Sequence, residues 1–138
     1  MKGTLMWIYK NKQINSHDDL LPDCTDFVYM IYYSNGQKYI GKKTVRSKRK
    51  KPPLKGKKRC RRIMTKLPFV NYEGSSDLPA GLVITKKEIL YQCGAKKAAT
   101  YLEAALLFHH DAIFDPMYLN ENISGTFFNN SLDGLLEY

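Results

Sequence analysis

Two β-rich segments on either side of a short turn constrain the fold of this chain most. Residues 27–33 read FVYMIYY and residues 37–41 read QKYIG, with Ser34-Asn35-Gly36 between them. Aromatic and β-branched residues favour strands, and an Asn-Gly pair favours the positive φ angles of hairpin turns. The sequence therefore predicts an antiparallel hairpin, and the rest of the fold has to be built around it.

The length of the turn decides where two tyrosines of this hairpin point. A two-residue loop would place Tyr29 and Tyr39 on opposite faces of the sheet, because side chains alternate with period two. A three-residue loop, Ser34 to Gly36, pairs Ile31 with Tyr39 and brings both tyrosines to one face. It also requires a residue in the left-handed conformation, which glycine adopts easily. If the two tyrosines act together, we expect the three-residue loop.

The basic residues are concentrated in one tract. The net charge is +9, yet residues 38–66 hold 15 Lys and Arg and no Asp or Glu, leaving 7 basic and 13 acidic residues elsewhere. A solvated loop is the ordinary explanation of a charge run, and nuclear localisation is a weaker one. The length of this tract and its junction with the hairpin favour contact with nucleic acid. The residues expected to contact DNA are Lys42, Lys43, Arg46, Lys48, Lys50, Lys51, Lys57, Lys58, Arg59, Arg61 and Arg62.

Length and composition fit one domain over residues 1–138, with 1–25 as an N-terminal extension and 121–138 as an unassigned tail. We expect no membrane span and no signal peptide, because no apolar run is long enough for either. Three scattered cysteines, Cys24, Cys60 and Cys93, form neither a disulfide framework nor a zinc motif. Reduced thiols and hence a cytoplasmic location are expected.

The remaining patterns predict an α+β fold. Leu5 to Tyr9 alternates weakly, as a short strand would, and Thr85 to Cys93 predicts a third strand beside the hairpin. Thr44 to Lys51 and part of Gly56 to Lys66 are expected to form short helices. Ala95 to Asp111 is the strongest helix prediction.

One carboxylate stands out in that last helix. Residues 98–108 are apolar nearly all round, which predicts a buried helix, and Glu103 lies in the middle. An unpaired buried carboxylate costs several kcal/mol, so Glu103 needs a partner. The partner is either a lysine or arginine in a buried salt bridge or a metal ion in a cleft. The hairpin and the basic tract favour the metal ion.

Together these parts suit phosphodiester hydrolysis. The reaction needs a positioned nucleophile, positive charge at the developing phosphorane and a hard, oxygen-liganded cation such as Mg²⁺. Glu103 could bind the cation, and Tyr29 or Tyr39 could relay a proton if their phenol pKa fell from about 10. Fixed charge could come from three residues: Arg49, Arg46 and Lys43.

The histidines are weaker candidates for site residues than Glu103 and the tyrosines. His109 and His110 are adjacent in the predicted helix, so they point about 100° apart and cannot share one metal ion. His17 lies among acidic residues with no obvious partner. Trp7 is expected in the core.

The hairpin resembles that of the GIY-YIG nuclease family, and the small phage-type members in particular. Val28-Tyr29-x-Ile31 and Tyr39-Ile40-Gly41 match the two half-motifs, although Phe27 stands in place of the first glycine. The resemblance implies a small three-stranded antiparallel sheet flanked by helices. It also implies a divalent metal cofactor, usually Mg²⁺ and alternatively Mn²⁺.

The resemblance further implies roles for individual residues. It matches the family's arginine on the first helix to Arg49, with Arg46 as an alternative, and its metal-binding glutamate to Glu103. The family's late asparagine matches Asn120, with Asn122 as an alternative. Pro53 stands where many members carry a helix histidine, so this chain uses another residue for that role or none.

The resemblance implies a metal-dependent DNA endonuclease that serves homing or competition between genomes. With no separate DNA-binding module expected in 138 residues, selectivity has to come from the domain, a homodimer or a partner protein. A non-catalytic nucleic-acid-binding protein on the same scaffold is the main alternative. An RNA-processing or ribosome-associated protein is the third possibility.

Overall fold

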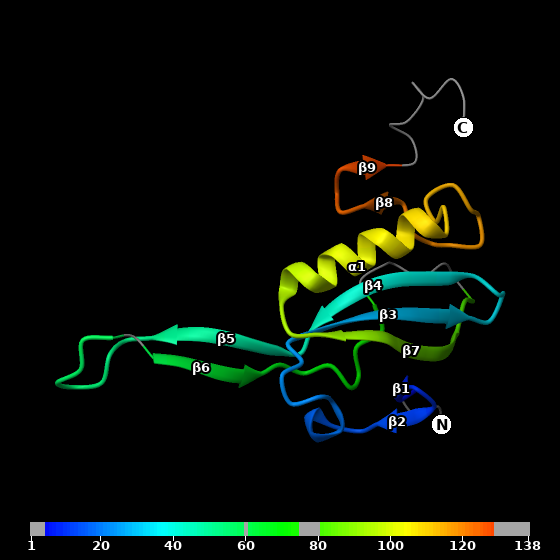
Figure 1. Ribbon diagram of the computed structural model, residues 1–138. Coiled ribbons are helices and arrows are strands. Elements are labelled where there is room, and N and C mark those ends of the chain that lie inside the picture. Colours follow the sequence, from blue (N-terminus) through cyan, green and yellow to red (C-terminus); the bar gives the residue numbers. More distant parts are fainter. Residues whose placement is uncertain (1–4, 60, 75–80, 129–138) are drawn as a thin grey trace.

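The computed structural model describes residues 5–59, 61–74 and 81–128, without the side chains of 48–51, 61 and 62. A five-stranded sheet with the order β2-β1-β7-β3-β4 carries helix α1 (Lys96–His109) on one face (Figure 1). The strands are β1 (Trp7–Tyr9), β2 (Lys12–Ile14), β3 (Asp26–Tyr33), β4 (Lys38–Thr44) and β7 (Ile84–Cys93). The α+β class is confirmed, but the predicted three-stranded antiparallel sheet is too small, and the actual sheet is mixed.

The two additional strands come from the N-terminal segment. β1 pairs in parallel with β7, with Trp7 opposite Lys87, and the Trp7 side chain is fully buried. Lys10 and Asn11 have φ angles of 48° and 68°, as a tight hairpin turn requires, so β2 folds back antiparallel to β1. A parallel partner so distant in sequence leaves no local signal, which is why the hairpin alone predicted a smaller sheet.

The β3–β4 hairpin has the three-residue turn. The Tyr33 amide donates to the Gln37 carbonyl at 2.9 Å, and Ile31 is opposite Tyr39. Gly36 has a φ angle of +89°, the left-handed conformation expected of it. The predicted register is therefore confirmed, and Tyr29 and Tyr39 share a face.

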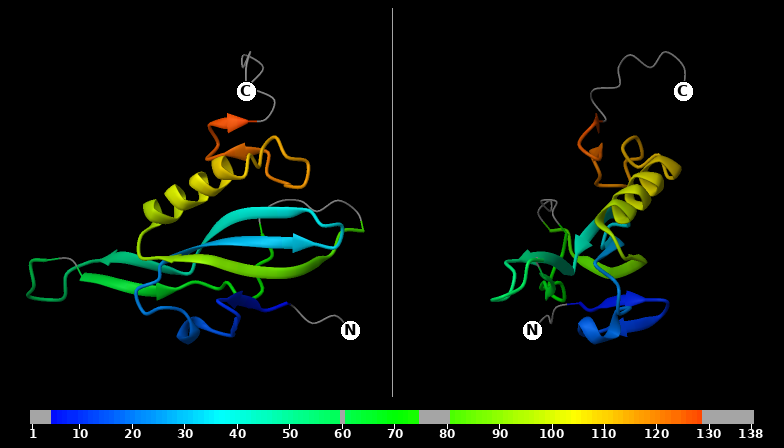
Figure 2. Two further views of the ribbon diagram at one scale, coloured as in Figure 1. Left: turned by 45° about the vertical axis from the view of Figure 1, so that its right-hand side comes forward. Right: turned by 60° about the vertical axis from the view of Figure 1, so that its left-hand side comes forward.

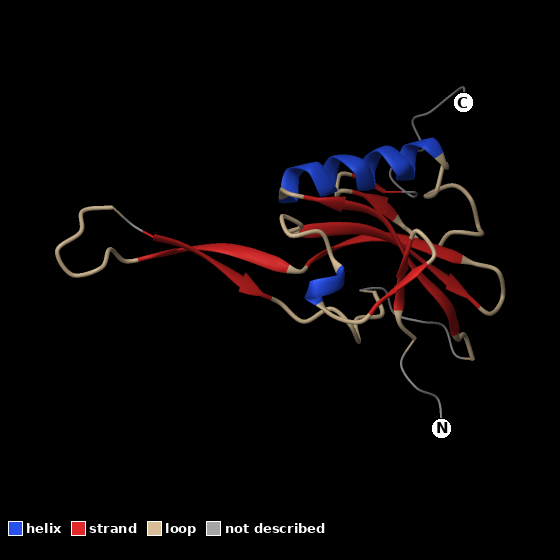
Figure 3. Cartoon of the chain, turned by 60° about the horizontal axis from the view of Figure 1, so that its bottom comes forward, coloured by secondary structure: helices blue, strands red, loops and turns tan. Residues whose placement is uncertain are grey.

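The basic tract forms a second, two-stranded sheet that projects from the body as an arm (Figure 1). β5 (Arg46–Lys51) pairs antiparallel with β6 (Arg61–Lys66), so both predicted helices in this tract are wrong. A helix there would place like charges one turn apart, whereas Pro52-Pro53 and Gly56 (φ +84°) supply a loop that lets the tract fold back on itself. Figure 3 shows the arm as an isolated pair of strands.

Helix α1 is less buried than its composition predicts. Ala99 and Leu107 are buried against the sheet, but Tyr101 is 73% exposed and Phe108 is 55% exposed. The sheet covers only one side of the helix, so the prediction of a helix buried all round is wrong. Within the described residues, no helix is long and apolar enough to cross a bilayer.

Three small elements complete the fold. The 3-10 helix η1 (His17–Asp19) is capped by Ser16, and β8 (Asn122–Ile123) pairs with β9 (Phe127–Phe128) above α1 (Figure 2). Buried side chains fill both faces of the main sheet. The face away from α1 holds a core that includes Trp7, Phe27, Tyr29, Ile31 and Phe69. The face under α1 holds a core that includes Val28, Met30, Ile40, Leu107 and Ile113.

Candidate active site

Three tyrosines gather on the face of the sheet away from α1. The rings of Tyr29 and Tyr39 lie 6.3 Å apart, centroid to centroid, and Tyr29 is only 1% exposed. The hydroxyl groups of Tyr29 and Tyr72 are 3.5 Å apart, and their rings meet edge to face. Tyr72 reaches this position from the loop after β6. The hairpin register thus brings Tyr29 and Tyr39 together, and a distant loop adds a third phenol.

Glycine is required where Tyr29 crosses the edge strand. A Cβ at position 41 would overlap the Tyr29 hydroxyl and lie 2.6 Å from its Cζ atom. Tyr29 is directly opposite Gly41 in the β3–β4 register, so its ring extends over the glycine toward the outer edge of β4. Gly74 (φ +93°) packs against the same tyrosines from the loop side. Because Gly41 has no side chain, the Tyr29 phenol can reach the sheet edge.

Two consecutive lysines of β4 place positive charge on both faces of this edge. The Lys43 ammonium lies 4.9 Å from the centroid of the Tyr72 ring, on the tyrosine face. The Lys42 ammonium donates to the Thr100 hydroxyl at 2.5 Å, on the helix face. Adjacent strand residues point to opposite faces, and that alternation explains the division.

Glu103 lies one helical turn beyond Thr100, on the same side of α1. Its carboxylate is half-buried, and this burial raises its pKa, whereas the nearby Lys42 ammonium lowers it. The charge of Glu103 in turn helps to raise the pKa of Tyr29, so the two groups interact across the edge of β4. Glu103 is therefore within electrostatic range of Lys42 and of Tyr29, although Tyr29 lies on the other face of the sheet.

The donor set at Glu103 suits a cation that is shared with a substrate. No three His, Cys, Asp or Glu side chains among the described residues are grouped closely enough to hold a metal ion by themselves. Mg²⁺ commonly takes only one or two carboxylates and completes its shell with water and phosphate oxygens. A lone, half-buried carboxylate near the Lys42 ammonium fits that mode.

The electrostatics of Tyr29 limit its chemistry. Burial raises its pKa far above the ordinary value, and Tyr72, Tyr39 and Glu103 raise it further. The proton-relay hypothesis required the opposite shift. Tyr29 therefore stays protonated in this state and serves as a hydrogen-bond donor, which leaves the half-buried Tyr39 as the more accessible phenol.

Asn120 holds the edge strand in place. Its side-chain oxygen accepts from the Ile40 amide at 3.0 Å, and its side-chain nitrogen donates to the Ile40 carbonyl at 2.8 Å. The main chain continues this pairing: the Lys38 amide donates to the Met117 carbonyl, and the Leu119 amide donates to the Lys38 carbonyl. Residues 117–120 therefore cover this edge as far as Ile40. Asn122, the alternative, instead accepts from the Gly125 amide in an exposed turn.

These observations agree with the comparison with known families. A family model for the GIY-YIG domain of the putative endonuclease segE matches residues 7–123. The chain belongs to the GIY-YIG endonuclease family. No curated protein and no solved structure matched the chain. Family membership makes this a nuclease domain, with DNA as its implied substrate.

This GIY-YIG domain departs from the expected placement of its arginines. Arg49 lies in β5, opposite Ile63, and not on a helix. Arg46 is 8% exposed, and its guanidinium donates to the carbonyl groups of His17, Leu21, Pro22 and Cys24. Arg46 therefore fits neither a phosphate contact nor an alternative to Arg49, because its donors are used inside the fold.

His17, which has no obvious partner in the sequence, fixes the base of the arm. Its Nε2 atom is 3.0 Å from the Val45 carbonyl and 2.8 Å from the Leu67 carbonyl. Of the other expected DNA contacts, Lys57, Lys58 and Arg59 are exposed in the arm loop. The side chains of the rest lie outside the described part of the structure: Lys48, Arg49, Lys50, Lys51, Arg61 and Arg62.

Two residues of this domain's site were not found from the sequence. Lys87 is 1% exposed, and its ammonium donates to the Val70 and Tyr72 carbonyls at 3.1 and 2.9 Å. It thereby fixes the loop that presents Tyr72. A signal existed for Lys87, which is two residues from the core residue Ile89 in a strand.

Proposed function

We propose that this chain is a metal-dependent DNA endonuclease that hydrolyses phosphodiester bonds. The observation that carries the proposal is that Tyr29, Tyr39 and Lys43 lie together on one face of the edge strand near Gly41, while Glu103 lies on α1 within electrostatic range of Lys42 and Tyr29. Phenols, an ammonium group and a half-buried carboxylate are the groups that a phosphate-hydrolysing site needs within reach of one phosphate. The family match supports nuclease chemistry independently.

Each residue has a proposed part. Tyr39 holds the attacking water, and the protonated Tyr29 donates a hydrogen bond to Tyr72 and packs beside the Tyr39 ring. Lys43 lies beside Tyr72 and stabilises the charge that develops on the phosphate. Asn120 keeps β4 in register through Ile40. Arg49 contacts a DNA phosphate from the arm.

Glu103 is the proposed ligand of Mg²⁺, or of Mn²⁺ in its place. When bound there, the cation would supply positive charge at the scissile phosphate and lower the pKa of a coordinated water. Lys42 tethers β4 to α1 through Thr100, one helical turn before Glu103.

The biological setting is proposed from the family resemblance. A small nuclease of this kind serves as a phage-encoded homing enzyme or acts against a rival genome in competition between genomes. Selectivity for a target comes from the domain itself, from a homodimer or from a partner protein. A cytoplasmic location follows from the same setting.

The experiment that tests the function is cleavage of supercoiled plasmid by purified protein with Mg²⁺, beside samples with EDTA. Metal-dependent conversion to nicked or linear DNA is expected. Intact plasmid, together with tight binding to it, would support the non-catalytic alternative. Stronger binding to structured RNA than to a DNA duplex of equal length would favour an RNA-processing role.

A further inference from the structure

The β5–β6 arm is the part of the fold that is least stable by itself. Twelve of the chain's 22 Lys and Arg residues lie between Arg46 and Lys66, and the segment has no Asp or Glu. A two-stranded sheet that stands alone in water is marginally stable at best. Figure 1 shows it extending away from the main sheet and α1. Because the arm is basic, exposed and marginally stable, we expect a binding partner to cover it.

The strand register adds charge repulsion to this exposure. Two of the pairs that face each other in the outer half of the arm are cation with cation: Lys50 with Arg62 and Lys51 with Arg61. Like charges directly opposite each other destabilise a strand pair. A polyanion lying along the arm removes that repulsion, whereas an apolar or basic partner does not. The register therefore selects an anionic occupant.

The base of the arm is anchored firmly. The Leu67 amide donates to the Val45 carbonyl at 2.9 Å, and His17 Nε2 reaches both the Val45 and the Leu67 carbonyl groups. The buried Arg46 guanidinium ties β5 to the carbonyl groups of residues 17–24. The arm thus leaves the body in a fixed direction, directly after the strand that carries Tyr39 and Gly41.

The dimensions of the arm fit one groove of duplex DNA. Paired strands lie about 4.8 Å apart, and six residues of strand extend roughly 20 Å. The major groove, about 12 Å wide and 8.5 Å deep, admits a two-stranded ribbon, whereas the minor groove, about 6 Å wide, does not. The ribbon also exposes Ile63 (37%) and Met64 (41%) on its two opposite faces, and the one that faces the base edges can contact thymine methyl groups there.

We propose that the β5–β6 arm enters the major groove of duplex DNA and is the main element by which this chain holds and reads its substrate. This inference rests on the proposed function, because it takes DNA as the substrate. It adds that the partner is a duplex, that the groove is the major one, and that the contact lies to one side of the catalytic cluster.

Charge-matched variants test the arm directly. One variant replaces four exposed basic residues of the arm loop, Lys55, Lys57, Lys58 and Arg59, by glutamine. The control replaces four exposed basic residues elsewhere by glutamine: Lys10, Lys12, Lys96 and Lys97. A third variant replaces residues 49–63 by Asn-Gly, which joins the facing residues Lys48 and Met64 by a two-residue turn. Binding is measured in EDTA by fluorescence anisotropy, so that cleavage plays no part.

The loop variant is expected to bind a 30-base-pair duplex at least 10-fold more weakly, with a shallower salt dependence, and the control less than 2-fold more weakly. Methyl green, a major-groove ligand, should compete with the wild-type protein, and the minor-groove ligand netropsin should not. The Asn-Gly variant should bind most weakly of all. Equal binding by the loop variant and the control would overturn the inference, as would competition by netropsin alone or tighter binding to single-stranded DNA.

The binding assays separate this inference from the proposed function. Arm-dependent duplex binding by a wild-type protein that cuts nothing with Mg²⁺ would leave the inference standing and remove the nuclease proposal. Metal-dependent cleavage with arm-independent binding would support the nuclease proposal and overturn the inference about the arm. Because the four loop residues are exposed, their replacement should leave the fold intact even if the Asn-Gly variant does not fold.

Discussion

The hydroxyl group of Tyr29 lies over Gly41, in the space that a Cβ atom at position 41 would occupy. The tyrosine is the buried partner of the pair, held at 1% exposure between Trp7, Tyr39 and Tyr72. Position 41 has no room for a side chain while Tyr29 keeps this place, so the glycine of the second half-motif has a steric reason in this chain.

The first prediction concerns that relationship. Gly41→Ala should lower the free energy of unfolding by about 1–3 kcal/mol, because the Tyr29 ring has no space to move. The displaced phenol should also slow cleavage. Gly94→Ala is the control, since its Cβ would lie 3.5 Å from the Asp23 carbonyl, an ordinary contact. Urea unfolding that shows equal effects of both substitutions would contradict the steric account.

Asn120 should be far more important than Asn122. Asn120→Ala removes both side-chain bonds to the Ile40 backbone and should cost about 2–3 kcal/mol of unfolding free energy. Asn122→Ala removes one bond in an exposed turn and should cost less than about 1 kcal/mol. Urea unfolding with parallel cleavage assays measures both. A larger loss of activity in Asn122→Ala would reverse the assignment.

Arg46 should behave as a structural residue. Arg46→Met deprives the carbonyl groups of residues 17–24 of their donor and should cost about 2 kcal/mol or more in unfolding free energy. Lys55→Met, at an exposed arm position, should change stability by less than about 0.5 kcal/mol. If Arg46→Met weakened DNA binding at unchanged stability, Arg46 would be a phosphate contact after all.

Much of the central hairpin followed from the sequence. Turn chemistry acts over a few residues, so Ser34-Asn35-Gly36 limited the register to two choices. The assumption that Tyr29 and Tyr39 act together then selected the three-residue loop, which the structure has. The helix 96–109 is local in the same sense. Glu103 was identifiable because one carboxylate among apolar residues is conspicuous.

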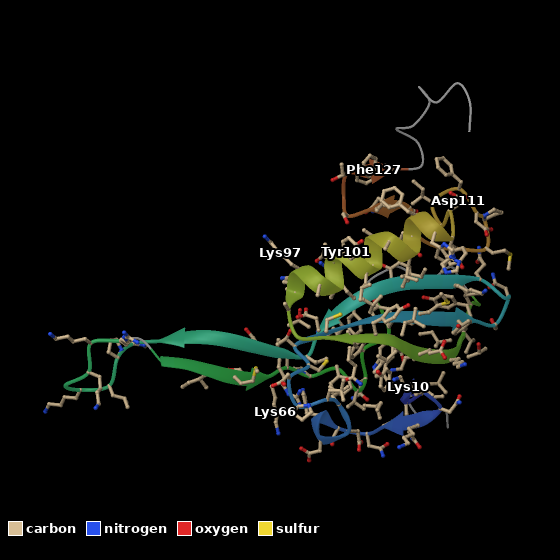
Figure 4. The ribbon with its side chains drawn as sticks, viewed as in Figure 1. Lys10, Lys66, Lys97, Tyr101, Asp111 and Phe127 are labelled. Carbon is tan, nitrogen blue, oxygen red and sulfur yellow. The ribbon has the colours of Figure 1, made fainter. Side chains whose placement is uncertain are left out.

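What escaped prediction depends on contacts between distant residues. The parallel pairing of Trp7 with Lys87 and the bonds of His17 to Val45 and Leu67 leave no periodic trace in the sequence. The basic tract resembles a helix or a loop by composition, and only the pairing of its two halves makes it a ribbon. The burial of Glu103 could be foreseen, but the exposure of the outer face of its helix, seen at Tyr101 in Figure 4, could not.

Lys87 provides a test by pH. Burial lowers its pKa to about 8, with partial opposition from the nearby Glu73 carboxylate. Between pH 8 and about 10.4 the unfolded chain binds a proton that the folded chain does not, so stability from this residue rises with pH. Below pH 8 both states are protonated and the contribution is constant.

Lys87→Met should therefore remove a slope of up to about 1.4 kcal/mol per pH unit from the unfolding free energy between pH 8 and 10. Lys97→Met, at an exposed helix position, should leave that slope unchanged. Urea unfolding at a series of pH values measures it. Parallel curves for the wild-type protein and Lys87→Met would show that the buried ammonium does not titrate in this range.

The most direct test of the account is the single-turnover cleavage rate of an end-labelled DNA duplex with Mg²⁺, for the wild-type protein, Glu103→Gln and Glu121→Gln. Glu121 is the control because it is an exposed carboxylate. The account predicts that Glu103→Gln binds the duplex normally in EDTA but cuts it at least about 100-fold more slowly, while Glu121→Gln cuts at the wild-type rate. Wild-type protein that leaves the duplex intact, or Glu103→Gln that cuts it at the wild-type rate, would contradict the account.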